Sequence, residues 1–384
     1  MNLLFDFIPL QYVGGVGGHA SFTKRVLDEI LIKKNDDVQI YGVIDSTLPE
    51  SSNYQIKEIA INNKITILDL AENKICNIIK DYSIDSFFIS IGQLYAKYDL
   101  NNIQCKTIMF IHDIFDVERC DNLIDASLFD KYKDSWFTYS KRLINLFSGR
   151  WKNQMQKCYN SIMPLYYNST TIPYTVSEYT RQALYYYFPN ISNEIKICYS
   201  PLKNCERHSK IENVELNQLI SSNKPYLLMI AANRRYKNPH TVIKVFKRLQ
   251  TEYPDIHLVT LKYGKTISNR HLDINYLSDS DLENAYYHAK LLIFPSFFEG
   301  FGYPPIEAMK YGTPTIVSNV TSIPDIIKDA SFYFSPFYPA DLYRKIKIVL
   351  DNPKLLKEKI EKRYNDICKR QESDLNDLIR CILS

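Results

Sequence analysis

The chain alternates short apolar runs with segments of helical periodicity, and this alternation constrains its fold more than any other feature. In the first half a helical pattern covers 20–33, and the apolar runs are LLFDFIPL, VQIYGVI, IDSFFISIG (84–92), KTIMFIHD (106–113) and TTIPYTVS (170–177). Short β-like runs separated by helices indicate βαβ units and a parallel sheet. We therefore predict a Rossmann-like α/β domain over residues 1–203.

The alternation stops in a polar stretch and then starts again. The stretch 203–224 ends in a turn signal, Asn223-Lys224-Pro225. Beyond it the apolar runs are PYLLMIAAN (225–233), IHLVTLKYG, LLIFPS (291–296) and TPTIVS (313–318), and helical patterns cover 239–252, 279–289, 339–350 and 353–383. A chain of 384 residues is long enough for two domains of roughly 180 residues each. We predict a linker at 204–224 and a second Rossmann-like domain at 225–359.

The composition argues against several other classes of protein. Apolar residues make up 45% and charged residues 23%, as in globular proteins, and a net charge of +4 is too small to indicate nucleic acid binding. The eight cysteines show neither CxxC spacing nor pairing with histidine, so we expect neither a zinc site nor disulfides. No segment reaches the roughly 18 apolar residues that span a bilayer, and the first residues lack the basic start of a signal peptide. We expect a cytoplasmic protein.

One segment is both basic and rich in aromatic residues. Residues 131–157 carry seven bases against one acid, Asp134, and the apolar residues among them include Trp136, Phe137 and Trp151. This composition suits contact with an anionic membrane surface. An amphipathic helix with a solvated basic face is the alternative, and such helices are common. Association with the inner face of the cell membrane therefore stays open.

The segment 294–312 has the form of a ligand-binding strand end. In open α/β sheets ligands bind where strands end and helices begin, because backbone N–H groups and the helix dipole meet there. Gly300 and Gly302 allow the backbone to approach an anionic group closely. The N–H groups for a diphosphate would come from Phe301, Gly302 and Tyr303. Glu307, in the first helical turn, can accept hydrogen bonds from a pair of hydroxyls such as those of a ribose.

The stretch SFFEGFGYPPIEAMKYGTPTIVSN, in which seven residues separate Glu299 from Glu307, resembles the donor signature of the retaining GT-B glycosyltransferases of family 4. The resemblance implies an α/β fold of two Rossmann-like domains whose parallel sheets face a central cleft. It also implies that Glu307 binds the nucleotide ribose and that Glu299 lies near the donor sugar, with main-chain contacts from Phe301 and Gly302. A capping-box role is the alternative for Glu307, but it does not explain the segment as a whole.

A second stretch, AANRRYKNPHTVIKVFKRL (231–249), resembles the strand, basic turn and helix start of the same family. Lys237 and Asn238 fit the pair that opens the family's helix. The resemblance implies that basic side chains here neutralise the leaving diphosphate, whose charge grows as the glycosidic bond breaks. The arginine departs from the usual spacing, so Arg234 and Arg235 compete for that role, and we favour Arg235. A basic surface at a helix start is the alternative.

The glycine loop of the first half, Gly14 to Gly18, lies between the first apolar run and a helix. In the family this loop faces the donor phosphates and the acceptor, which implies contacts from Gly15, Gly17 and Gly18. Taken alone, the loop also satisfies G-x-G-x-x-A, and Asp45 follows the second apolar run. A nicotinamide-dependent oxidoreductase is therefore an alternative from a different class, but it leaves residues 225–320 unexplained.

Three further segments have counterparts in the family. His112-Asp113 follows an apolar run and resembles the family's cleft His-Asp, which implies that His112 contacts donor-sugar hydroxyls or positions the acceptor. Ser177-Glu178 matches a recurrent segment, which we interpret as the cap of the next helix. The final helix, 360–384, is expected to pack back on the first domain, as it does in the GT-B fold.

The resemblance implies a retaining reaction by front-face substitution. The departing phosphate oxygen would take the acceptor proton while Lys237 and Arg235 stabilise its charge, and a carboxylate nucleophile, as in glycosidases, is the alternative. No cofactor or metal is then required, and Asp279-Ser280-Asp281 is interpreted as a helix N-cap rather than a metal-binding Asp-x-Asp.

The substrates that the resemblance implies are a GDP- or UDP-linked hexose and a saccharide or lipid-linked hydroxyl, in the synthesis of a bacterial surface polysaccharide. Other GT-B enzymes, such as a sugar-nucleotide epimerase or a sucrose-type synthase, are alternatives. So is a binding module without activity.

Overall fold

The computed structural model describes residues 1–11, 18–49, 54–122, 135–191, 193–203 and 207–384. The chain divides into two compact units. The first unit contains Met1–Asp121, Ile144–Lys203 and Lys369–Ser384, and the second contains Asn122–Leu143 and Asn204–Cys368. The main division falls at the start of the expected linker 204–224. That stretch is more than a connection, because it includes helix α10 (Val214–Ser221) of the second unit.

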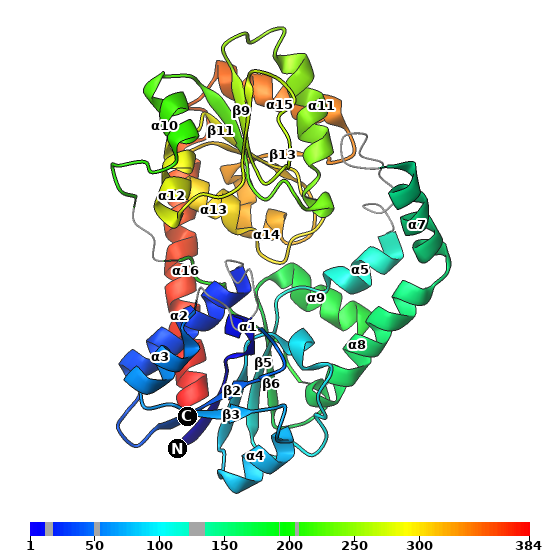
Figure 1. Ribbon diagram of the computed structural model, residues 1–384, viewed down its shortest axis with the longest axis vertical. Helices are drawn as coiled ribbons and strands as arrows, with labels where there is room; N and C mark the ends of the chain where they lie inside the picture. Colours follow the sequence, from blue (N-terminus) through cyan, green and yellow to red (C-terminus); the bar gives the residue numbers. More distant parts are fainter. Residues whose placement is uncertain (12–17, 50–53, 123–134, 192, 204–206) are drawn as a thin grey trace. The chain divides into compact units, whose positions relative to one another are not determined.

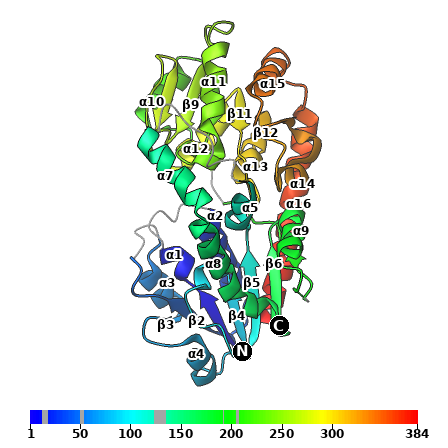
Figure 2. The ribbon, with the colours of Figure 1, turned by 90° about the vertical axis from the view of Figure 1, so that its right-hand side faces the viewer.

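The first unit is built on a parallel sheet. Its described strands are β1 (Asn2–Asp6), β2 (Gln39–Ile44), β3 (Thr66–Asp69), β4 (Ser86–Ile89), β5 (Lys106–Ile111), β6 (Thr171–Thr175) and β7 (Lys196–Ile197). They lie in the order β3-β2-β1-β4-β5-β6-β7, and neighbouring strands run parallel. Figure 2 shows the series from β3 through β2, β4 and β5 to β6.

Side chains on both faces of this sheet are buried by helices. The described helices are α1 (Ile8–Gln11), α2 (Gly18–Lys33), α3 (Ile56–Asn62), α4 (Ile75–Asp81), η1 (Gly92–Tyr95), α5 (Phe115–Asn122), α8 (Arg150–Tyr166) and α9 (Glu178–Tyr187). The residues of α7 (Trp136–Phe147) are divided between the two units. One core joins α4, α8 and α9 to alternate strand residues such as Phe87 and Met109. On the other face, the ring centroid of Phe22 in α2 lies 4.8 Å from that of Phe110. Burial on both faces explains why the inner strands are continuous apolar runs.

The second unit has the same architecture. Its strands are β8 (Tyr226–Met229), β9 (His257–Leu261), β10 (His271–Ile274), β11 (Leu291–Phe294), β12 (Thr315–Ser318) and β13 (Phe332–Phe334), in the parallel order β10-β9-β8-β11-β12-β13. Besides α10, its helices are η2 (Arg235–Lys237), α11 (Pro239–Leu249), α12 (Asp279–His288), α13 (Tyr303–Met309), α14 (Ile323–Ile327), η3 (Lys328–Ala330) and α15 (Pro339–Asp351).

Two separate cores hold the helices of the second unit on its sheet. Leu227 and Met229 of β8 pack with α11 and α15, whereas Tyr226 and Leu228 pack with α10, α12 and α13. Figure 1 shows β9 and β11 between α10 and α12 on one side and α11 and α15 on the other. Alternate side chains of each strand therefore serve opposite faces, as a sheet covered on both sides requires.

The helix α16 (Lys357–Leu383) belongs to both units. In the second unit, Arg363 donates from Nε to the Ile326 carbonyl at 2.7 Å. In the first unit, Asp374 accepts a hydrogen bond of 2.9 Å from the Tyr199 N–H, and Ile382 is fully buried. The expected return of 360–384 to the first domain therefore applies to Lys369–Ser384, while the preceding turns lie in the second unit. Among the described residues, no helix has the length and apolar character needed to cross a bilayer.

The first apolar run is not a single strand. β1 ends at Asp6, and Ile8–Gln11 forms α1 instead of continuing the strand. The Asp6 carboxylate accepts the Ile8 N–H at 3.1 Å, which turns the chain, and Pro9 suits the first turn of a helix.

The Asp6 carboxylate joins three elements at the carboxyl edge of the first sheet. It is fully buried and accepts hydrogen bonds from the Ser90 N–H (3.1 Å), the Ser90 hydroxyl (2.9 Å) and the Tyr95 hydroxyl (2.8 Å). Burial raises the pKa of Asp6 to about 6, although these donors act to lower it. Asp6 thus fixes the end of β1 against the residues that follow β4.

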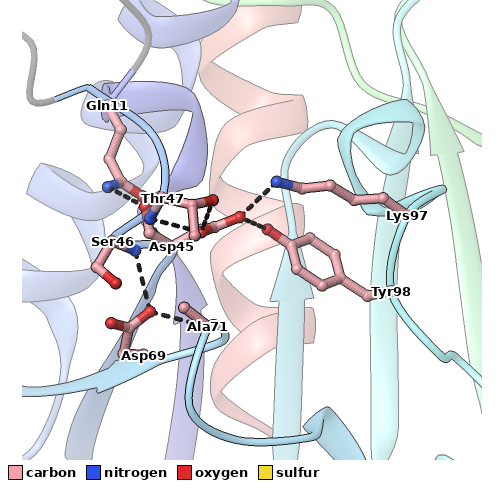
Figure 3. A network of polar contacts seen from close by, with 8 residues as sticks. All are labelled: Gln11, Asp45, Ser46, Thr47, Asp69, Ala71, Lys97 and Tyr98. Carbon is pink, nitrogen blue, oxygen red and sulfur yellow. Dashed lines mark hydrogen bonds and ion pairs between the residues drawn. The ribbon is translucent and has the colours of Figure 1, made fainter.

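A second buried carboxylate, Asp45, lies where β2 ends (Figure 3). One oxygen accepts the N–H and the hydroxyl of Thr47, and the other accepts Lys97 and Tyr98. The side chain of Gln11 forms two hydrogen bonds with the Asp45 backbone, of 2.8 and 3.0 Å. Burial acts to raise the pKa of Asp45, but the bonds from Lys97, Thr47 and Tyr98 prevail and hold it well below its usual range. The network therefore anchors Gln11, the residue before the glycine loop.

The pKa values of these two carboxylates are shifted in opposite directions, so their contributions to stability should depend on pH in opposite ways. The pKa of Asp6 is above its ordinary value of 3.8, so the folded state binds the proton more tightly, and the contribution of Asp6 to the free energy of unfolding should fall by about 2 kcal/mol as pH rises from 4 to 6. The pKa of Asp45 is below its ordinary value, so its contribution is complete above that value and is lost as pH falls. The measurement is a carboxyl-carbon NMR titration, with a midpoint near pH 6 expected for Asp6.

Matched variants identify each contribution. Asp6→Asn should remove the part of the pH dependence of unfolding between pH 4 and 6 that comes from Asp6, and Lys97→Met should move the Asp45 midpoint upward. An Asp6 midpoint near pH 4 in the wild type would contradict the burial argument.

Candidate functional site

The candidate site in the second unit consists of two loops that follow neighbouring strands. β8 pairs with β11, so the residues after both strands meet at the same edge of the sheet. The first loop carries Arg235, Lys237 and Asn238, and the second carries Glu299 to Tyr303. The Phe297 N–H donates to the Tyr236 carbonyl at 2.7 Å, which ties the two loops together. The structure thus brings together the two stretches that the sequence singles out in this half.

An ion pair joins the two loops at their centre. Lys237 Nζ lies 2.5 Å from Glu299 Oε1, and the two side chains are only 9% and 10% exposed. The ammonium group also lies 4.7 Å from the ring centroid of Phe294. In such a poorly solvated place, removing one partner would leave a charge without compensation. The pair therefore holds an ammonium and a carboxylate at fixed positions on the sheet edge.

Backbone geometry explains how Lys237 reaches this position. Lys237 ends the short helix η2, and Asn238 then adopts a left-handed conformation (φ 54°) before Pro239 begins α11. The Asn238 side chain donates to the Pro336 carbonyl at 3.1 Å and accepts the Thr241 hydroxyl at 2.8 Å. Asparagine is one of the few residues other than glycine that adopts this conformation readily. Asn238 therefore shapes the turn with its side chain, and a ligand contact here would use the backbone.

The two competing arginines differ in their surroundings. Arg234 is exposed and donates to the Tyr236 hydroxyl at 2.9 Å. Arg235 lies within η2 and is half-buried. The preference for Arg235 at a diphosphate remains a prediction.

The loop from Glu299 to Gly302 leads into α13, in which Glu307 is the fifth residue. The prediction that Glu307 lies in the first helical turn is therefore wrong by one turn, because α13 already begins at Tyr303. The Glu299 N–H donates to the Thr321 hydroxyl at 3.0 Å, and the Ser322 hydroxyl donates to the Glu299 carbonyl at 2.8 Å, so this backbone is held on both sides. Gly302 has φ +91°, and a Cβ there would lie 2.5 Å from Ile323 Cδ1. Only glycine fits that position without displacement.

Phe301, Tyr303 and Glu307 contribute differently to this loop. The Phe301 ring is buried and contacts the Tyr303 ring edge-on at 5.3 Å, so a ligand contact by Phe301 would come from its backbone. Gly300, Tyr303 and Glu307 are half-buried. The Glu307 carboxylate accepts a hydrogen bond of 2.6 Å from the Tyr286 hydroxyl.

In the first unit, His112 follows β5 and is buried. Its Nε2 lies 3.0 Å from the Ser90 carbonyl oxygen, which can only accept, so Nε2 carries the proton. Burial, followed by the neighbouring His19, holds the pKa of His112 well below its ordinary value. The imidazole is therefore neutral, and its orientation depends on Ser90, which also bonds Asp6.

The glycine loop is only partly described. Gly18 is the first residue of α2, whereas Gly15 and Gly17 lie outside the described residues. The Asp45 carboxylate, which a dinucleotide-binding interpretation would place on a ribose, already accepts Thr47, Lys97 and Tyr98. The oxidoreductase alternative therefore loses its acidic ribose ligand.

The sequence predicts helix caps at Ser177 and at Asp279-Ser280-Asp281, and only the first is the cap itself. Ser177 caps α9 as predicted, since its hydroxyl accepts the Thr180 N–H at 3.2 Å. The stretch Asp279-Ser280-Asp281 begins α12, but the cap is Ser278, whose hydroxyl accepts the Asp281 N–H. The Asp281 carboxylate instead accepts the N–H groups of Glu212 and Asn213, at 3.0 and 2.9 Å. It therefore anchors the start of α10.

Three residues at these edges were missed from the sequence: Asp6, Ser90 and Tyr286. Asp6 and Ser90 follow apolar runs and resemble ordinary strand ends. Helical periodicity could have identified Tyr286, because its buried face continues from Ala285, whereas the adjacent Tyr287 is 48% exposed.

The match to a known family model lies in the second unit. Residues 211–366 match the family model described as Glycosyl transferases group 1. O-antigen chain mannosyltransferase B of Escherichia coli is 44% identical over 63 residues, which cover 16% of this chain and 16% of that protein. O-antigen chain mannosyltransferase RfbU of Salmonella typhimurium is 28% identical over 159 residues, which cover 39% of this chain and 44% of that protein. The chain therefore matches less than half the length of these curated relatives.

Solved structures resemble the whole chain in fold. WaaG, a glycosyltransferase involved in lipopolysaccharide biosynthesis, has a TM-score of 0.64 at 12% identity, covering 100% of this chain and 99% of that one. Anabaena HepE in complex with UDP and glucose has a TM-score of 0.61 at 13% identity, with 100% of both chains covered. At these identities the likeness concerns the fold alone, and it confirms the predicted GT-B class with two Rossmann-like domains. The match over 211–366, the mannosyltransferase relatives and the GT-B fold together support a group 1 glycosyltransferase.

Proposed function

We propose that the chain is a retaining glycosyltransferase of family 4 that moves a hexose from a GDP- or UDP-sugar to a hydroxyl of a saccharide or lipid-linked acceptor. The observation that carries this proposal is the buried Lys237–Glu299 pair between the loops after β8 and β11, within the stretch 211–366. A fixed ammonium beside a glycine-containing loop suits a bound diphosphate.

The donor would use the second unit as follows. Backbone N–H groups of Gly300, Phe301, Gly302 and Tyr303 would face the diphosphate, and Glu307 would accept the ribose hydroxyls. Lys237 and Arg235 would stabilise the charge that grows on the leaving phosphate. Because the Lys237–Glu299 pair already exists, the donor would enter a site whose charged groups need little reorganisation.

Retention would follow from front-face substitution. The bond from the anomeric carbon to the phosphate oxygen breaks while the acceptor oxygen bonds to the same face of that carbon. The acceptor proton passes to the departing phosphate oxygen, so no protein base and no metal ion is needed. Glu299 would act on the donor sugar through a carboxylate already fixed by Lys237. From the first unit, neutral His112 and the glycine loop with Gly15, Gly17 and Gly18 would contact the sugar or the acceptor.

The proposed hexose is mannose first and glucose second. Two of the relatives are mannosyltransferases of O-antigen chains, which favours a mannosyl donor and a role in bacterial surface polysaccharide synthesis. HepE, of the same fold, is known with UDP-glucose. A sugar-nucleotide epimerase would use the same donor site without an acceptor.

A donor screen tests the proposal. GDP-mannose or a UDP-hexose should raise the melting temperature of the protein, since a ligand that binds only the folded state stabilises it. The productive donor should then give a glycoside with the anomeric configuration of the donor. Folded protein stabilised by neither GDP- nor UDP-sugars would overturn the assignment, and isomerised nucleotide sugar in the absence of acceptor would identify an epimerase.

Substitution of Lys237 tests the catalytic half of the proposal. Lys237→Ala should lower kcat by roughly 100- to 1000-fold, because the leaving diphosphate loses its nearest cation, and KM should change much less. Lys310→Ala is the control, since Lys310 also forms an ion pair with a buried acid, Glu283 (2.7 Å), although the Lys310 side chain is more exposed than that of Lys237 (29% against 9%). If both variants slow transfer equally, Lys237 contributes only to the stability of the fold and not to catalysis.

We also propose peripheral contact with an anionic membrane through the segment 131–157. In its described part, Trp136, Phe137 and Ile144 of α7 are 74%, 66% and 65% exposed, and Lys141 Nζ lies 4.3 Å from the Phe137 ring centroid. Exposed aromatic rings beside bases suit the interface of an anionic bilayer.

Vesicle sedimentation tests this contact. The protein should sediment with vesicles that contain anionic lipid and much less with zwitterionic vesicles, and Trp136→Ser with Phe137→Ser should abolish the difference. Tyr338→Ser is the control, because Tyr338 is 67% exposed elsewhere. Binding that is unaffected by the paired substitution would argue for the solvated-helix alternative.

A further inference from the structure

We propose that Tyr286 is a positioning residue that holds the Glu307 carboxylate for the ribose hydroxyls of the donor nucleotide. This inference rests on the proposed function, because it assumes that Glu307 meets the ribose.

The contact is a single directed hydrogen bond. The Tyr286 hydroxyl donates to Glu307 Oε2 at 2.6 Å, and the Tyr286 side chain is fully buried. Burial, followed by the charge of Glu307, holds the pKa of Tyr286 well above its ordinary value. The hydroxyl therefore keeps its proton, and a hydroxyl has one proton to donate. One oxygen of the carboxylate is thus fixed in direction before any ligand binds.

The backbone around Tyr286 is itself fixed. The Tyr286 carbonyl accepts the Thr313 hydroxyl at 2.8 Å. Ala285 and Tyr286 lie in the core that joins α12 to β8, β9 and β11. The phenol is therefore held by the core on the sheet and by Thr313, which follows α13, the helix that carries Glu307.

A second contact sets the register between α12 and α13. Glu283, one turn before Tyr286, accepts hydrogen bonds from Lys310 and Tyr311, which directly follow α13. The two helices are thus joined by two polar contacts near the C-terminal end of α13. The acid lies on α12 in one contact and on α13 in the other. Only the contact at Glu307 involves a residue proposed to bind the donor.

Fixing the carboxylate should matter for affinity. A glutamate side chain has three rotatable bonds, and ordering it on ligand binding opposes association. A hydrogen bond that orders it in advance removes this cost and keeps the oxygens aimed at the two hydroxyls. Loss of one bond to a charged group should weaken nucleotide binding by roughly tenfold.

Tyr286→Phe tests the inference, and Tyr226→Phe is its matched control. Both changes remove one buried hydroxyl from the same core, but the Tyr226 hydroxyl bonds a backbone carbonyl instead of Glu307. Binding of UDP and GDP is measured by calorimetry. For the nucleotide that the wild type binds, Tyr286→Phe should raise Kd about tenfold, and Tyr226→Phe should leave Kd within about twofold.

Nucleotides without ribose hydroxyls separate positioning from general destabilisation. The wild type should lose affinity for the 2′-deoxy and 3′-deoxy forms, and Tyr286→Phe should bind ribo and deoxy forms almost equally. In Glu307→Gln, adding Tyr286→Phe should cause little further loss. A tenfold effect that persists with the deoxy forms would overturn the inference, as would equal effects of the two tyrosine variants. If the wild type binds neither diphosphate, the proposed function itself fails.

Discussion

Parallel pairing between neighbouring strands is the constraint on which the rest of the structure depends. Parallel strands end at the same edge, so residues that follow β8 and β11 meet although they are far apart in sequence. The Lys237–Glu299 pair exists because of this geometry, and so does the contact between Ser90, after β4, and Asp6, at the end of β1. Parallel sheets must also be covered on both faces, which accounts for the paired cores around each sheet.

How well the fold could be predicted depended on the position of each strand. The strands inside both sheets were predicted from apolar runs, whereas β3, β7, β10 and β13 were missed, and these four are the edge strands. An edge strand is less enclosed, so its residues include exposed and half-buried ones and give no continuous apolar run. Similarly, LLFDFIPL is apolar throughout, and only the hydrogen bond from Ile8 to Asp6 reveals that it turns into a helix.

The candidate site was predictable where sequence neighbours act together. Glycines, a helix start and spaced glutamates lie within one stretch, and Lys237 with Asn238 lies within another. The partners that hold these residues come from elsewhere in the chain: Tyr286 supports Glu307, and Thr321 and Ser322 hold the backbone of Glu299. Helical periodicity can mark Tyr286 as buried, but no local pattern shows which residue it supports, because that role is defined only by tertiary contact. The same holds for Asp45, whose position after a strand suggested a ligand contact but whose carboxylate is used by Lys97 and Tyr98.

The helix α16 has a consequence for the order in which the chain can complete its two units. Residues 369–384 contribute buried Leu375, Leu378, Ile379 and Ile382 to the first unit, yet they are synthesised after the whole of the second. During translation, the apolar surface of the first unit that these side chains cover therefore stays exposed to solvent until residues 369–384 are made. By then all strands of the second unit have been synthesised. The N-terminal unit of this protein should therefore be the later of the two to close its core, which reverses the usual order of folding on the ribosome.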